Sequence, residues 1–156
     1  MRVIGIDPGY DRLGVAIIEK QAGQDAVVFS TCIETDKRAD LPTRLFAAGE
    51  ELASLIAIHQ PDLLGIETLF FNKNVKTAIG VAEARGMVLF IAKQAGCTIC
   101  ELSPQQVKIA VTGYGSSDKP AVVAMLERLV LNLPAKALDD EYDAIAVGVA
   151  ALAHQH

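Results

Sequence analysis

Acidic residues stand at three points of the chain where an apolar run ends or a helix is expected to begin. Asp7 closes the run "VIGID" and Glu67 closes "LLGIE", while Asp140 and Asp143 lie in "LDDEYDAIAVG". A spacing of three residues places Asp140 and Asp143 on one face of a helix. Functional sites form at the carboxyl ends of central strands in open α/β sheets. The sequence therefore predicts that these four carboxylates converge on one point.

Converging carboxylates repel one another and therefore require cations. Hard oxygen ligands favour Mg²⁺ or Mn²⁺ over Zn²⁺, and the sequence offers neither a His/Cys cluster nor the spacing of a Ser-His-Asp triad. The chemistry that fits is hydrolysis of a phosphodiester by two metal ions about 3.5–4 Å apart. One ion would activate a water molecule and the other would stabilise the leaving oxygen.

Each carboxylate also has a purely structural interpretation. Asp7 precedes a Pro-Gly pair and could start a turn, and Glu67 could be a solvated strand end. Asp140 and Asp143 could complement the helix dipole. We predict that the neighbouring Asp139 is the N-cap of the last helix, which leaves Asp140 free to bind metal. The alternative is that Asp139 takes the place of Asp140 as the ligand.

The elements that position these residues follow from hydrophobic patterning. Strands are expected at 2–7, 14–19 and 26–33, with the turn "PGYDRL" joining the first two. The pattern then predicts a helix from "DLPTRLF" to about 59, a buried strand at 63–67, a helix at 75–94, a strand at 97–102, and helices near 104–111, 119–130 and 140–153. This order predicts one α/β domain over residues 1–156. Its core would be a mixed five-stranded sheet, three antiparallel strands followed by parallel ones, flanked by helices.

Composition narrows the class of protein. The 156 residues carry a net charge of -5, which argues against a general nucleic-acid coat but allows a local basic groove. Cys97 and Cys100 lie in a predicted strand, where residues three apart point to opposite faces, so packed and reduced thiols are expected. We find no signal-peptide pattern and no apolar run of the length that spans a membrane. The sequence thus predicts a cytoplasmic protein without a membrane segment.

The helix expected at 75–94 has two apolar faces. One carries Val75, Ile79, Ala82 and Leu89, and the other carries Ala84, Met87, Val88 and Ile91. The first face could cover the sheet, so the second requires another partner. That partner is either a second copy of the chain or the neighbouring helices of the same chain.

Along nearly its whole length the chain resembles the RuvC family of Holliday-junction resolvases, which have the ribonuclease-H-like fold. The segments "GIDPG", "PDLLGIE", "FFNKN", "EARG", "QQVK", "GYGSSDK" and "DDEYDAIAVG" follow the family's order and approximate spacing. The resemblance implies that Asp7, Glu67, Asp140 and Asp143 are the catalytic ligands of two Mg²⁺ ions, with Mn²⁺ as a substitute. It also implies paired symmetric nicks in four-way DNA junctions during recombination and repair.

The same resemblance implies which residues contact DNA. Lys108 and Lys119 match positions that approach the DNA backbone near the site. Phe70 is expected to stack on unpaired bases, with Phe71 as the alternative. The remaining cations expected to extend the basic surface are Lys73, Lys76 and Arg85.

A homodimer would place two active sites on a symmetric junction. The interface expected from the resemblance and the second helix face consists of Ala84, Met87, Val88 and Ile91. The chain departs from the family at Ala16, where a second glycine is frequent, and in the Pro-Ala pair that follows Lys119.

Two rival functions remain open at the level of sequence. One is another ribonuclease-H-like nuclease, acting on RNA–DNA hybrids or flaps. The other is a non-catalytic junction-binding module. The preferred cleavage sequence, the physiological metal and a branch-migration helicase as a further partner also stay open.

Overall fold

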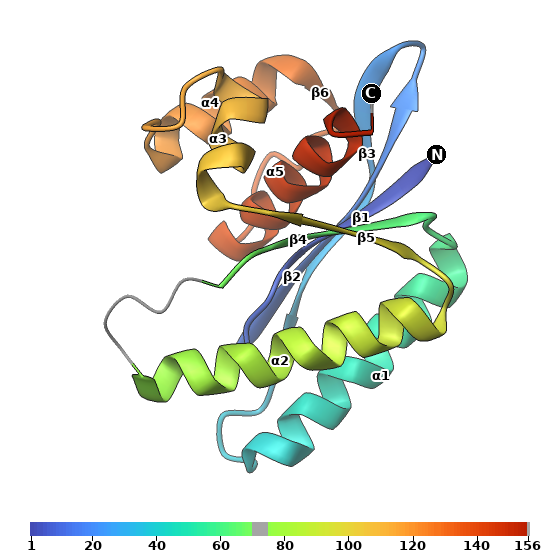
Figure 1. Cartoon of the computed structure of the whole chain (residues 1–156), viewed down its shortest axis with the longest axis vertical. Coiled ribbons are helices and arrows are strands. Elements are labelled where there is room, and N and C mark those ends of the chain that lie inside the picture. Colours follow the sequence, from blue (N-terminus) through green and yellow to red (C-terminus); the bar gives the residue numbers. More distant parts are fainter. Residues whose placement is uncertain (70–74, 156) are drawn as a thin grey trace.

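The chain forms a mixed sheet with helices on both faces (Figure 1). In this computed structural model, residues 1–69 and 75–155 are described, apart from the side chains of Val75 and Lys76. The strands run in the order β5-β4-β1-β2-β3-β6. Their bounds are β1 (Arg2–Asp7), β2 (Arg12–Gln21), β3 (Gln24–Glu34), β4 (Leu63–Glu67), β5 (Thr98–Leu102) and β6 (Val130–Leu131).

The pairing of the strands confirms an antiparallel start and a parallel continuation. Strands β1, β2 and β3 pair antiparallel, whereas β4 pairs parallel with both β1 and β5. The described part of the chain has six strands and not the predicted five, because β6 adds two residues parallel to β3. A strand this short, directly after a helix, has no alternation by which its sequence could be recognised.

Five helices cover the described part of the sheet. They are α1 (Leu41–His59), α2 (Val75–Gln94), α3 (Pro104–Thr112), α4 (Lys119–Leu129) and α5 (Asp139–Ala153). Two separate apolar clusters fill the space on the two sides of the sheet: α1 and α2 contribute to one, and α3, α4 and α5 to the other. Side-chain caps fix several helix starts, such as Asp40, whose carboxylate accepts from the backbone N–H of Thr43 at 2.9 Å.

The apolar face of α2 that was expected to be free is covered by the chain itself. Ala84 and Val88 are fully buried within the chain, and Met87 and Ile91 lie against Gly49 of α1, where an added Cβ would stand 3.0 Å from the Met87 sulfur. Assigning these residues to a dimer contact is therefore wrong for Ala84 and Val88 and unsupported for Met87 and Ile91. The reason is that α1 lies beside α2 and packs against this face. Of the two partners considered, the one present here is a neighbouring helix of the same chain.

Glycines allow α5 to approach the sheet very closely. A Cβ on Gly5 would stand 2.2 Å from the carbonyl oxygen of Ala144, and one on Gly14 would stand 1.9 Å from that of Asp140. In return, Gly148 of α5 lies against the backbone of Gly5. The first turn of α5 is thereby held next to the carboxyl end of β1.

Candidate active site

The period of two along a strand directs Asp7 and Glu67 to the same side of the sheet. In β1, Ile4 and Ile6 join the apolar cluster under α1 and α2, whereas Val3 faces the other cluster. Asp7 shares the face of Val3 and so points to the α5 side. Strand β4 pairs in parallel register with β1, and by the same alternation Glu67 ends beside Asp7.

The third contribution comes from α5. Its first turns carry Asp140 and Asp143, and both charges act on Asp7. Burial and the charges of Asp143, Asp140 and Glu67 together raise the pKa of Asp7 to about 7. Burial and Asp143 also raise the pKa of Glu67. The site thus holds more negative charge than its surroundings neutralise, which is the condition under which a cation is taken up.

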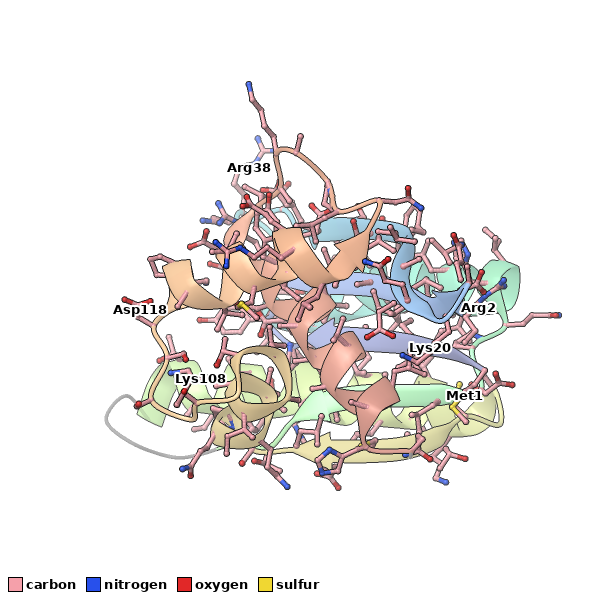
Figure 2. The ribbon with its side chains drawn as sticks, turned by 90° about the horizontal axis from the view of Figure 1, so that it is seen from above. Met1, Arg2, Lys20, Arg38, Lys108 and Asp118 are labelled. Atoms are coloured by element: carbon pink, nitrogen blue, oxygen red, sulfur yellow. The ribbon has the colours of Figure 1, made fainter. Side chains whose placement is uncertain are left out.

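Two lysines border the carboxylates. Asp118 caps α4 by accepting from the backbone N–H of Ala121 at 3.0 Å, and the next residue, Lys119, donates from Nζ to Asp143 Oδ2 at 2.7 Å. Lys108 of α3 lowers the pKa of Glu67, against the effect of burial. Figure 2 shows Lys108 and Asp118 on the same side of the molecule.

These groups enclose a hollow of about 210 Å³. It is lined by Asp7, Glu67, Lys108, Lys119, Asp143 and apolar residues of α3, α4 and α5. Three of the four predicted carboxylates and both lysines therefore line one hollow, and Asp140 lines a neighbouring one.

The carboxylates are not yet arranged around a common point. Among residues 1–69 and 75–155 no three acidic, histidine or cysteine side chains stand close enough to hold one ion as they are oriented here. Asp140 lies 3.5 Å from Nη1 of Arg12, and Asp143 is held by Lys119. Four carboxylates fit a hard divalent cation, and two of them pair with a protein cation in this structure.

Helix α5 begins one residue earlier than expected. Asp139 is its first residue, and the N-cap is Leu138, which makes no side-chain hydrogen bond. The prediction that Asp139 caps the helix is therefore wrong. Asp139 is mostly exposed and lies 3.4 Å from Lys119. Asp140, in contrast, is half-buried and is among the charges that raise the pKa of Asp7.

Two of the predicted DNA contacts lie at the site, and most of the others fall outside the described residues. Lys108 and Lys119 lie at the site. Phe70, its alternative Phe71 and Lys73 lie outside the described residues, as does the side chain of Lys76.

Arg85 does not extend a basic surface, which corrects our expectation. It is half-buried and donates from Nε to the carbonyl oxygen of Glu67 at 3.1 Å, while Nη2 contacts Glu101. Arg85 thus connects α2 to the ends of β4 and β5. Since both of these contacts use its guanidinium group, that group is not available to bind a phosphate.

A second hollow of about 460 Å³ adjoins the site on the opposite side of Asp7. It is lined by the turn after β1, by Asp140, by Thr77 and Val81 of α2, and by two cations, Arg12 and Lys37. The sequence analysis assigned no role to Arg12 or Lys37. The available signal was the place of Arg12 in "PGYDRL", directly after the strand that carries Asp7.

The described residues contain no helix long and apolar enough to cross a membrane.

The family model for "Crossover junction endodeoxyribonuclease RuvC" matches residues 3–154. Proteins of that name from Thermosipho melanesiensis and Syntrophomonas wolfei are 44% and 37% identical to the chain. The first alignment covers 94% of both chains, and the second covers all of this chain and 89% of the relative.

Solved structures show the same similarity in three dimensions. The structure described as T. thermophilus RuvC in complex with Holliday junction substrate superposes with a TM-score of 0.89 at 26% identity, over 96% of this chain and 92% of that one. The yeast mitochondrial Holliday junction resolvase Ydc2 superposes with a TM-score of 0.69 at 13% identity, over 96% of this chain and 77% of that one. The second match bears on the fold alone.

Proposed function

Because the chain belongs to the RuvC family of crossover junction endodeoxyribonucleases, we propose that it resolves four-way DNA junctions by metal-dependent hydrolysis of phosphodiester bonds. The observation that carries this proposal is the half-buried Asp7 at the end of β1, whose pKa is raised to about 7 by desolvation and by the charges of three other carboxylates. The relative whose structure contains a Holliday junction supports a four-way junction as the substrate.

We assign Asp7, Glu67, Asp140 and Asp143 as the catalytic ligands of two divalent ions. Mg²⁺ is the proposed ion and Mn²⁺ a substitute, because all four donors are carboxylates. When bound, the ions supply an activated water and stabilise the leaving oxygen. Asp7 lines the hollow that holds Glu67 and Asp143 and also the one that holds Asp140, so it is the residue that would be shared between the ions.

Lys119 and Lys108 act on the phosphate. Lys119 Nζ lies 2.7 Å from Asp143 and 3.4 Å from Asp139. With Asp143 as a metal ligand, this ammonium group would be placed to face the scissile phosphate and to balance its developing charge. Lys108 does the same from α3, beside Glu67.

The segment after Glu67 supplies the contacts to unpaired bases. We retain Phe70 as the stacking residue and Lys73 and Lys76 as phosphate contacts, on the strength of the family motif "FFNKN". This motif begins three residues after Glu67, so we expect the contact to lie near the metal site.

A homodimer supplies the two cuts that a symmetric junction needs. With Ala84 and Val88 buried inside the chain, the surface that we assign to the dimer is made by the exposed apolar side chains of α1 and α2. These are Phe46, Ile58, Ile79 and Phe90.

If its substrate is a DNA junction, the protein must act in the compartment that holds the chromosome. In bacteria, to which the relatives belong, that compartment is the cytoplasm. A branch-migration helicase would act on the same junctions, and we keep it as a candidate partner.

A substrate comparison tests the function. End-labelled four-way junction, linear duplex and RNA–DNA hybrid are incubated with the protein in Mg²⁺ or in Ca²⁺. We expect paired nicks in opposed strands of the junction, in Mg²⁺ only. Preferential cutting of the hybrid would support another ribonuclease-H-like nuclease, and junction binding without cutting in either metal would support a binding module.

The control for this experiment is Asp7→Asn. It removes charge at the centre of the site while keeping the shape of the side chain. We expect it to bind junctions at least as tightly as the native chain, because less negative charge opposes the phosphates, and to leave them uncut. Cutting at a comparable rate would contradict the metal assignment.

A further inference from the structure

Asp7 lines three hollows, and two of them contain cations. The first holds Lys108 and Lys119 on the side of α3 and α4. The second holds Arg12 and Lys37 on the side of the turn after β1. Asp7 lines both, and Asp143 lines the first while Asp140 lines the second, so the two hollows adjoin the candidate metal site. The chain has a net charge of -5, so acidic residues outnumber basic ones. The presence of cations in both of these hollows is therefore notable.

The charge of Arg12 is shared between two carboxylates and committed to neither. Its side chain is 44% exposed, with Nη1 3.5 Å from Asp140 and Nε 3.9 Å from Glu34. Both distances exceed those of a close hydrogen bond. Exposed pairs of this kind contribute little stability, so they are readily exchanged.

Lys37 is likewise held loosely. Its Nζ lies 3.8 Å from Asp11, and its side chain is 71% exposed. Asp11 already has a closer partner in Arg44, which is mostly buried, also bonds Thr35 at 3.0 Å and lies over the ring of Tyr10. Because Arg44 neutralises Asp11, the charge of Lys37 is available to a ligand.

We propose that the DNA strand being cut continues from the metal site into the second hollow, where Arg12 and Lys37 bind the backbone phosphates next to the scissile one. The inference rests on the proposed function and extends it to two phosphate-binding residues. It also assigns an exchange to Arg12. When Asp140 binds a metal ion, Arg12 loses that carboxylate as a partner and turns to the phosphate.

Salt dependence of junction binding tests the proposal. The full chain and its Arg12→Gln, Lys37→Gln and double variants are titrated with a labelled four-way junction in Ca²⁺, over a series of KCl concentrations. Each phosphate contact adds about 0.9 to the slope of log K against log salt. We expect each single variant to lower that slope by about one and the double variant to lower it by about two.

The matched control is Lys20→Gln. Lys20 also forms an ion pair, 2.7 Å from Asp25, and its loss changes the net charge equally. Lys20 lies near the end of β2, whereas Arg12 is the first residue of that strand, and Figure 2 shows Lys20 away from Lys108 and Asp118. We expect its slope to equal that of the native chain, which separates a local phosphate contact from a general change in charge.

Metal removal tests the exchange step. In EDTA, Arg12 stays with Asp140, so Arg12→Gln should lower the slope less than it does in Ca²⁺. An equal reduction in both buffers would overturn the exchange. Slopes unchanged by all three variants would overturn the phosphate site, while a native chain that neither prefers nor cuts junctions would instead overturn the proposed function.

Discussion

At the scale of single residues, the environment of Asp7 links the site to the stability of the fold. A carboxylate with an ordinary pKa of 3.8 is held at about 7 by burial and by neighbouring negative charge. The folded chain without metal therefore binds a proton at Asp7 more tightly than the unfolded chain does. The resulting stability is full below pH about 4 and is lost as the pH rises through about 7.

This linkage predicts that Asp7→Asn stabilises the metal-free protein at neutral pH. Asparagine cannot ionise, so the variant escapes a loss on the order of 1–3 kcal/mol. Thermal unfolding in EDTA should show equal melting temperatures near pH 4 and a difference that grows to pH 7 and then levels off. Added Mg²⁺ should narrow the difference by stabilising only the native chain. A difference that is constant with pH would contradict the explanation.

The adjacent aspartates Asp139 and Asp140 are expected to behave differently. Asp139 is 80% exposed on its side chain and forms only a surface ion pair with Lys119, so Asp139→Asn should change stability by less than about 1 kcal/mol and leave cleavage nearly intact. Asp140→Asn should fold normally and lose more than about tenfold in Mg²⁺-dependent cleavage. Loss of a residue that only supports a metal ligand already costs about tenfold or more, and loss of the ligand itself should cost more. Cleavage rates in the reverse order would make Asp139 the ligand.

The sequence predicts the acidic residues of the site and, through the family resemblance, Lys108 and Lys119, but it does not point to Arg12 or Lys37. Asp7 and Glu67 are recognisable because a carboxylate at the end of a buried run is unusual, and the parallel pairing of β1 and β4 brings them together. Arg12 and Lys37 carry no comparable signal, since lone cations in turns are usually solvated. Arg12 follows the turn after β1 and Lys37 follows β3, so their place beside Asp7 depends on how these two segments fold together.

At the scale of elements, the contact of α5 with β1 and β2 sets the geometry of the site. We predict that Gly5→Ala lowers the free energy of unfolding by about 1–3 kcal/mol or more, because its Cβ would meet the backbone of α5. It should also abolish cleavage by moving Asp140 and Asp143 away from Asp7. Chemical denaturation and a junction-cutting assay check both effects.

The matched control is Gly86→Ala on α2. A Cβ at Gly86 meets nothing within 4 Å, and alanine favours a helix by about 0.5–1 kcal/mol over glycine. This variant should therefore be slightly more stable and fully active. If both variants behaved alike, the close approach of α5 would not be what positions the site.

Periodicity identifies the helices well but does not say what each face touches. The expected bounds of α2 and α4 agree with the structure within one residue. The faces of α2 do not, because an apolar stripe fits a partner helix of the same chain as well as a second copy. Packing against Gly49 of α1 decides the matter, and it depends on contacts between residues far apart in sequence.

At the scale of the whole molecule, the exposed side chains of α1 and α2 bear on assembly. We predict that Phe90→Glu gives a folded monomer, because Phe90 is 68% exposed and its replacement would bury a charge only in the dimer. Met87→Glu should instead lower the melting temperature, because Met87 packs against α1. Sedimentation velocity and thermal unfolding separate the two effects. A native chain that is monomeric at high concentration would contradict the dimer.

The distribution of the carboxylates along the chain has a consequence for biosynthesis. Asp7 leaves the ribosome well before Asp140 and Asp143, which belong to α5, the last helix in the described part of the chain. A nascent chain that has reached only the middle of the sequence contains at most two of the four ligands. Nuclease activity would then arise in one late step, when α5 docks against Gly5 and Gly14. Truncated products of interrupted translation would be unable to cut the chromosome.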